Sequence, residues 1–322
     1  MSEYTPAISI LMSIYNESIN QIEASIQSVL DQTFTDFELI VVVDNPSGIE
    51  YVDLLRAYSK KDKRIKYLLN DSNIGLAMCM NKAFGISSGV YIARMDADDV
   101  SVPNRLSKEI KLLESGFDCV FSNYDIIDEN NKVISSDGSI KLIDKIPIEV
   151  QIANKSIIHH PTVMFTRDIF IKSGEYRNFI CSQDLDLWLR MMDSGCSFCY
   201  DSDILLHYRV RTSSVSGKNR FKQHLTINYI RERFMERLKK GFDTYSYENY
   251  LRYLEKEFSL KRNKRYAKMS SLMDGAKNDR DNGHRLRAVL KRIFVFLFSR
   301  VHRKTFMSNN PIKRAIIRKY EL

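Results

Sequence analysis

The amino-acid sequence predicts an α/β fold with a mainly parallel central sheet, followed by a helical C-terminal extension. Over residues 8–100, apolar strand segments alternate with segments of helical periodicity, which implies right-handed crossovers and parallel strands. Beyond residue 215, strand signals give way to helix-forming sequence rich in Lys, Arg and Tyr. The 322 residues, 44% of them hydrophobic, suit a globular protein with a sizeable core.

The individual elements follow from hydrophobic periodicity and from turn residues. In the first hundred residues we expect strands at 8–13, 38–44, 64–69 and 90–95, separated by helices at 19–30, 49–60 and 76–86. Later strands are expected at 118–122, 124–128, 162–166 and 204–210, and later helices at 103–115 and 182–195. Ser182 is a suitable N-cap for the last of these helices. The change in composition predicts two domains, 1–215 and 216–322.

Charge is distributed unevenly between these two parts. Residues 261–322 carry 18 lysines and arginines against 4 aspartates and glutamates, whereas residues 1–260 are net acidic at −5. An apolar run at 293–298 is flanked by basic residues, as in helices that bind anionic membrane surfaces; docking of this tail on the first domain explains the run equally well. Nucleic acid is not expected as a partner, because no recognised nucleic-acid module accompanies the charge.

The sequence also indicates a compartment. The N-terminus has an acid where a signal peptide has positive charge, and no run approaches the roughly 20 apolar residues of a membrane span. The five cysteines are scattered, as reduced thiols are. We expect a cytoplasmic protein, or one that is peripheral on the inner face of the cell membrane.

Three aspartates crowd the end of the fourth strand, in "YIARMDADDV". Ligands bind beyond the carboxyl ends of parallel strands, and carboxylates gathered there repel one another unless a cation or a proton intervenes. Asp96 and Asp98 suit a hard divalent ion, Mg²⁺ or Mn²⁺, that completes its shell with water and phosphate oxygens. Alternatively, these aspartates only form a turn and cap the next helix. Asp44, after the second strand, is either an acceptor for a polar edge of a ligand or an ordinary turn residue.

Two later segments carry further polar candidates. Asp184 begins the helix at 182–195, where the helix dipole stabilises a carboxylate and where a rigid element can also present a general base. His159 and His160 precede Pro161 on an expected loop, and adjacent loop histidines are more often structural than ligands.

Taken in order, six segments resemble the family-2 glycosyltransferases, which are nucleotide-sugar-dependent inverting enzymes of the GT-A (Rossmann-like) fold. The segments are "ISILMSIYNES", "IQSVLDQTFTDFELIVVVDN", "NIGLAMCMNKAFGISSGVYIARMDADDVSVPNRL", "HHPTVMF", "SQDLDLWLRM" and "YRVRTSSVS". The resemblance covers about residues 7–216, which is about two thirds of the chain.

The resemblance implies roles at matching positions. Asp44 would contact the nucleotide base, Asp96 and Asp98 would form the D-x-D (DXD) pair that holds the metal and the donor diphosphate, and Asp99 would support them. Asp184 would be the general base that deprotonates the acceptor hydroxyl. The remaining donor-binding residues would be Ser13, Tyr15, Asn16, Asn73 and Gly75, and the acceptor side would include His160, Pro161 and Trp188.

The sequence departs from the family pattern at three of these places. Val43 stands where one acid of a pair is common, so that Asp44 is alone. Gln183 stands where Glu commonly precedes the base, and Arg211 lies where a late His is often seen.

The resemblance therefore predicts an inverting, metal-dependent hexosyl- or N-acetylhexosaminyltransferase. It would move a sugar from a nucleotide sugar, most commonly a UDP-sugar, to a hydroxyl of a glycan or lipid-linked saccharide in cell-surface polysaccharide biosynthesis. A nucleotidyltransferase of similar sheet topology is one alternative, although "SIYNES" lacks a Gly-rich phosphate loop with a Lys. A non-catalytic scaffold that binds saccharide is the other.

Overall fold

The computed structural model describes residues 5–136, 140, 142, 146–155, 157–210, 220–299, 302–303, 311–314, 316 and 319. The chain divides into two compact units, Met1–Ser214 and Val215–Leu322. Because the two units are separate bodies, each is considered by itself.

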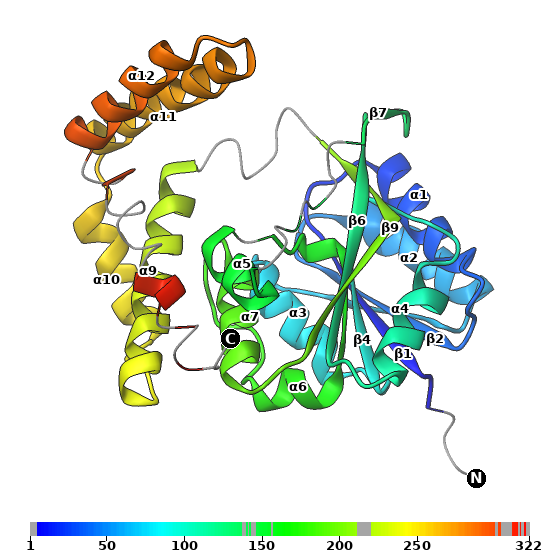
Figure 1. Ribbon diagram of the computed structural model, residues 1–322. Helices are drawn as coiled ribbons and strands as arrows, with labels where there is room; N and C mark the ends of the chain where they lie inside the picture. Colours follow the sequence, from blue (N-terminus) through cyan, green and yellow to red (C-terminus); the bar gives the residue numbers. More distant parts are fainter. Residues whose placement is uncertain are drawn as a thin grey trace. The chain divides into compact units, whose positions relative to one another are not determined.

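A single mixed sheet forms the centre of the first unit (Figure 1). Over the described residues it has nine strands in the order β3-β2-β1-β4-β8-β6-β9-β5, with β7 paired to β6. The strands are β1 Ile8–Ile14, β2 Phe37–Val43, β3 Ile65–Leu69, β4 Tyr91–Asp96, β5 Val100–Ser101, β6 Cys119–Ile127, β7 Val133–Ser135, β8 Val163–Thr166 and β9 Phe198–Arg209.

Helices cover both faces of this sheet. One face carries α1 Ile19–Leu30, α2 Ile49–Lys61 and α4 Arg105–Glu114. The other face carries α3 Leu76–Gly85, α6 Arg167–Lys172 and α7 Gln183–Asp193. The short helices α5 Ile148–Lys155 and η1 His160–Thr162 precede β8. Because both faces are covered, every residue of β2 is buried, and all of them except Glu38 are apolar.

The expected α/β class is confirmed, but the parallel part of the sheet is smaller than expected. β3, β2, β1 and β4 run parallel, as does the pair of β6 and β9. β8 is antiparallel to both β4 and β6, so it reverses the direction of the sheet. The two strands expected at 118–122 and 124–128 are one strand, β6, because β9 pairs with it along its whole length through a register shift.

Local sequence signals fix where the first helix begins. Ser18 accepts a hydrogen bond from the Gln21 backbone N–H, and the Gln21 side chain accepts one from the Ser18 N–H. This capping box satisfies two backbone donors at the start of α1. The buried face of α1, with Ile22, Ile26 and Val29, then packs into the core of the first unit.

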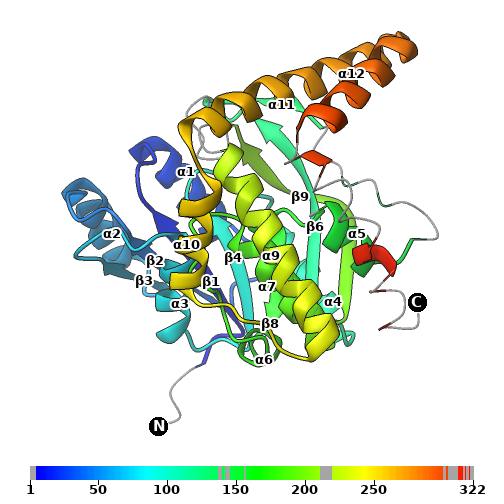
Figure 2. The same cartoon turned by 90° about the vertical axis from the view of Figure 1, so that its left-hand side faces the viewer.

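The second unit is helical (Figure 2). Its longer helices are α9 Arg220–Lys240, α10 Tyr247–Glu257, α11 Leu260–Asp281 and α12 Arg285–Phe298. Tyr250 of α10 is fully buried and shares a hydrogen bond of 2.8 Å with Thr226 of α9. α11 and α12 form a hairpin that turns at Gly283, whose φ of 81° favours glycine. No helix within the described ranges is both long enough and apolar enough to cross a membrane.

Candidate active site

The ends of three parallel strands meet at one edge of the sheet. In the pairing of β1 with β4, Ser13 lies opposite Asp96, and in the pairing of β1 with β2, Ile14 lies opposite Val43. The Asp44 N–H then donates to the Ile14 carbonyl at 2.7 Å. The sheet therefore brings Asp44 and Asp96 to the same edge, as the sequence predicts from topology, and Ser13 lies at that edge too.

Asp44 is buried and holds the loop that leads into α3. Its carboxylate accepts hydrogen bonds from the backbone N–H groups of Ile74 and Gly75, both at 2.9 Å, and from the Asn70 side chain at 2.8 Å. Its carbonyl accepts from the Asn73 side chain at 3.3 Å. Asp44 thus orders the Asn73–Gly75 turn, and the sequence alone did not reveal this second role.

The loop after β1 carries the other residues that were expected on the donor side. Tyr15 is 48% exposed, and the backbone N–H groups of Tyr15 and Asn16 donate to the Glu17 carboxylate at 2.7 and 3.2 Å. The Asn45 side chain donates to the Tyr15 carbonyl at 3.1 Å, which ties this loop to the one after β2. The loop is therefore held through its backbone at the edge where the strands end, and Tyr15 stays about half exposed.

The acid turn after β4 is held from several sides through its backbone. The Ser25 hydroxyl of α1 donates to the Asp96 carbonyl at 2.9 Å, and the Arg209 Nε of β9 donates to the Asp98 carbonyl at 2.6 Å. The Arg209 N–H also donates to the Asp99 carboxylate at 2.9 Å. These contacts leave the Asp96 carboxylate 31% exposed, while Asp98 is 8% exposed. The backbone of the turn is therefore held in place, with the Asp96 carboxylate partly exposed and Asp98 and Asp99 buried.

Negative charge is in excess within this cluster. Asp99 has no exposed surface, and its Oδ2 has no hydrogen-bond partner among the described atoms. Burial, followed by the charges of Asp96 and Asp98, raises the pKa of Asp99 well above its usual value. A cation bound at the cluster would relieve this repulsion.

Arg94, on β4, supplies a buried positive charge beneath the cluster. Its guanidinium is 3% exposed and forms an ion pair with Asp96. Its Nε and Nη1 have no hydrogen-bond partner among the described atoms. A cation inside an apolar strand is expensive unless it balances charge nearby. Sequence reasoning missed Arg94, although the one charged residue in "YIARM" was its signal.

Asp184 lies in the first turn of α7 and is partly exposed. Burial raises the pKa of its carboxyl group, the charge of Asp96 raises it further, and the charge of Arg94 and the N–H groups of Leu185 and of Asp184 itself lower it. Because Asp96 and Arg94 both act on it, Asp184 lies near the acid cluster, although the two are far apart in the sequence. The residue before α7, Ser182, has a φ of 58°, a conformation that is uncommon for residues other than glycine.

The two histidines before Pro161 have different surroundings. His160 is buried, its Nε2 is 2.7 Å from the Tyr176 hydroxyl, and its pKa is well below the usual value because of burial. His159 is stacked on Tyr124 at 4.3 Å and meets the edge of Tyr208 at 4.3 Å. Burial lowers the pKa of His159 to about 4, and the nearby charge of Asp96 opposes this. His159 was not chosen as a site residue from the sequence, yet it is the histidine whose pKa is affected by the charge of Asp96.

The structure corrects the expectation that Trp188 faces an acceptor. Its side chain has no exposed surface and packs edge-on against His160, with ring centres 6.1 Å apart, and against Phe165. Pro161 is also buried, in η1. Trp188 can therefore influence an acceptor only through the residues that it supports. It was read as a site residue because helical periodicity does not distinguish a face on a pocket from a face in the core.

Comparison with known proteins identifies the family. Residues 9–174 match the model of glycosyl transferase family 2, which is half of the chain. The chain belongs to this family.

Two relatives are similar in sequence to this chain over about two thirds of its length. MJ1057, an uncharacterized glycosyltransferase of Methanocaldococcus jannaschii, is 35% identical over 64% of this chain and 71% of its own length. WbnJ, an O-antigen biosynthesis glycosyltransferase of Escherichia coli, is 31% identical over 71% of this chain and 89% of its own. The family match thus includes the candidate site residues from Ser13 to Pro161 and ends before Asp184.

A solved structure shares the fold. TarS 1–349 of S. aureus, crystallised in complex with UDP, aligns with a TM-score of 0.58 and 15% identity, covering 97% of this chain and 91% of that one. The GT-A fold that the sequence predicted is therefore confirmed.

The acid cluster of this family-2 chain fits a divalent cation that arrives with a ligand. Over the described part of the chain, no three His, Cys, Asp or Glu side chains gather as a complete metal site. Mg²⁺ needs only one or two protein carboxylates when phosphate and water supply the other ligands. Asp96 and Asp98 could supply these carboxylates. Burial and the charges of Asp96 and Asp98 raise the pKa of Asp99, which shows that the turn disfavours further negative charge. Arg211, which stands where the family often has a His, lies outside the described residues.

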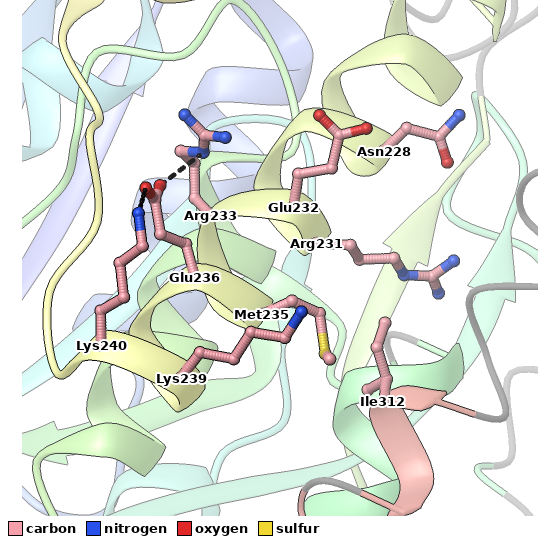
Figure 3. A pocket seen from close by; sticks show the side chains of 9 residues that line it. All are labelled: Asn228, Arg231, Glu232, Arg233, Met235, Glu236, Lys239, Lys240 and Ile312. Atoms are coloured by element: carbon pink, nitrogen blue, oxygen red, sulfur yellow. Dashed lines mark hydrogen bonds and ion pairs between the residues drawn. The ribbon is translucent and has the colours of Figure 1, made fainter.

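The second unit has a pocket of its own (Figure 3). It has a volume of about 360 Å³ and is lined by α9 and by Ile312. Arg233 and Lys240 both form ion pairs with the Glu236 carboxylate, at 3.4 and 3.1 Å, so this acid balances part of their charge. None of the predicted site residues lines this pocket.

Proposed function

We propose that the protein is an inverting, metal-dependent glycosyltransferase. It would transfer one hexose or N-acetylhexosamine from a nucleotide sugar, a UDP-sugar first among them, to a hydroxyl of a glycan or lipid-linked saccharide in cell-surface polysaccharide biosynthesis. The observation that carries this proposal is the placement of a partly exposed carboxylate, Asp184, near the acid turn of Asp96 and Asp98.

The donor side is proposed from the edge where the strands end. Ser13 lies near the end of β1. The loops after β1 and β2 and before α3, where ligands bind in α/β sheets, carry Tyr15, Asn16, Asp44, Asn73 and Gly75. In support, TarS binds UDP on a fold of the same kind. Asp44 would act both on the base and through the turn that it orders.

The two acidic parts divide the chemistry between them. A divalent cation held by Asp96 and Asp98 would supply Lewis-acid stabilisation of the diphosphate leaving group. Asp184 would accept the proton of the acceptor hydroxyl as that oxygen attacks the sugar on the face opposite the leaving group, which inverts the anomeric centre. Arg94 would keep Asp96 oriented and limit the rise in the pKa of Asp184. His160 and Pro161 would lie on the acceptor side, together with His159.

The acceptor class is proposed by analogy. WbnJ acts in O-antigen biosynthesis, so a growing cell-surface glycan is the first acceptor to test. We propose that the reaction takes place in the cytoplasm, at the inner face of the cell membrane, where the basic helices of the second unit would meet anionic lipid.

A thermal-shift panel of nucleotide sugars, each with and without Mn²⁺, tests the donor. We expect the true donor to raise the melting temperature by about 5 °C or more at a concentration of about 100 Kd, because such binding stabilises by about 2.7 kcal/mol. The rise should require Mn²⁺. Nucleoside triphosphates serve as the matched panel for a nucleotidyltransferase, and a metal-dependent response to them in place of sugar nucleotides would contradict the proposal.

The pH dependence of transfer tests the base. Asp184 must be ionised to accept a proton, and its folded pKa is raised, so transfer should fall as the pH drops through a value above the ordinary pKa of about 4. The measurement is kcat/KM against pH with the donor found in the panel, which reports groups of the free enzyme. A rate that stays constant down to pH 4 would contradict the assignment of Asp184.

A further inference from the structure

α12 presents a broad apolar face that the second unit leaves exposed. Eight large apolar side chains of this 14-residue helix are exposed, from 37% at Phe296 to 74% at Leu286. These residues are Leu286, Val289, Leu290, Ile293, Phe294, Phe296, Leu297 and Phe298. By contrast, the residues that α12 buries are small, Ala288 and Val295. Soluble proteins rarely leave so continuous an apolar surface uncovered without a partner.

The charges on α12 are arranged around this face. At 3.6 residues per turn, Arg285 and Arg292 fall along one border of the apolar face and Lys291 falls along the other. Arg287 lies near that second border, between Phe294 and Phe298. The helix has no acidic residue. Long basic side chains at the borders of an apolar face can place their charged ends among lipid headgroups while the face enters the acyl boundary.

The α11–α12 hairpin holds this face in a fixed orientation. Lys291 forms an ion pair with Asp279 of α11 at 2.7 Å, and Arg265 of α11 donates to the Phe298 carbonyl at 2.7 Å. α11 contributes seven lysines and arginines against three aspartates, so the whole hairpin is basic. It therefore complements an anionic surface in charge as well as in polarity.

The length of α12 excludes a membrane span. Fourteen residues extend about 21 Å as a helix, which is shorter than the hydrocarbon core of about 30 Å. We infer that α12 lies in the plane of an anionic lipid bilayer, with its apolar face in the interface and its arginines among the headgroups. This inference rests on the membrane location in the proposed function, but it concerns lipid binding alone and needs no donor.

Flotation of the full chain with vesicles tests the inference. We expect binding to vesicles that contain phosphatidylglycerol, weaker binding to phosphatidylcholine alone, and loss of binding as salt rises. The double variant Leu290→Glu, Ile293→Glu should reduce binding at least about tenfold, because both exposed side chains would otherwise enter the interface. Phe242→Glu is the matched control, since Phe242 is 62% exposed in the same unit but lies outside α12, and it should bind as the unchanged protein does.

The outcomes separate the possible occupants of this face. Equal vesicle binding by the double variant and the unchanged protein would overturn the inference, as would no binding by either. A change from dimer to monomer in the double variant, with no lipid binding, would assign the face to a second copy. A lowered melting temperature in that variant, again without lipid binding, would mean that the face packs on the catalytic unit. Because no donor is present, each result is independent of whether the protein transfers sugar.

Discussion

Replacing Asp184 by asparagine is expected to reduce transfer by about 10²- to 10⁴-fold, the range that a general base contributes. Asparagine keeps the size of the side chain but cannot take the proton of the acceptor hydroxyl. Donor binding, measured as the metal-dependent thermal shift, should persist, because Asp184 lies on the proposed acceptor side. A loss of rate with retained donor binding would separate a base from a donor ligand.

The stability of this variant provides a second, independent test. The folded state raises the pKa of Asp184, so folding favours the protonated carboxyl and the ionised form costs stability at neutral pH. Asparagine resembles the protonated form. The melting temperature of Asp184→Asn without ligands should therefore equal or exceed that of the unchanged protein, which excludes unfolding as the cause of lost activity.

A matched control comes from the neighbouring helix. Asp168 occupies the first turn of α6 and is exposed, so Asp168→Asn removes the same charge from a similar helix position outside the site. It should transfer at nearly the full rate. Full transfer by Asp184→Asn, or an equal loss in both variants, would show that Asp184 is not the base.

The positions in the fold that the sequence predicted correctly are those fixed by local pattern. An apolar run that ends in acids places Asp96 at the end of β4, and alternation of strand and helix places Asp44 at the same edge as Asp96. Both follow from the rule that parallel strands end together. Asp184 is different: its nearness to Asp96 depends on β8, which reverses the direction of the sheet, and only the resemblance to the family indicated it.

The parts missed are those that depend on tertiary packing. Arg94 matters because it forms an ion pair with Asp96. A single arginine in a strand sequence does not indicate which acidic side chain it will pair with. Helical periodicity marks Trp188 as facing inward, but whether that face meets a pocket or the core depends on Phe165 and His160. The single strand β6 was divided in two because the register shift with β9 has no local signature.

Replacing Asp98 by asparagine is expected to abolish the Mn²⁺-dependent thermal shift by the donor and to lower transfer by about 10²-fold or more. A cation that stabilises the leaving group as a Lewis acid is worth several kcal/mol, and each 1.36 kcal/mol is a factor of ten in rate. The turn itself should survive, because Arg209 holds Asp98 through its backbone carbonyl. Asp203→Asn, an exposed change on β9 that removes an ion pair with Lys108, is the control and should leave the thermal shift unchanged.

The charge balance of the cluster makes this prediction specific. Burial and the charges of Asp96 and Asp98 raise the pKa of Asp99, so removing the Asp98 charge relieves repulsion and should keep or raise the melting temperature without ligands. Without ligands, the melting temperature of the variant should thus be equal or higher. With Mn²⁺ and donor, the rise in melting temperature seen for the unchanged protein should be lost. If Asp98→Asn and Asp96→Asn both kept the full Mn²⁺-dependent shift, the cation would have to bind elsewhere, and the acid turn would serve only to shape the loop.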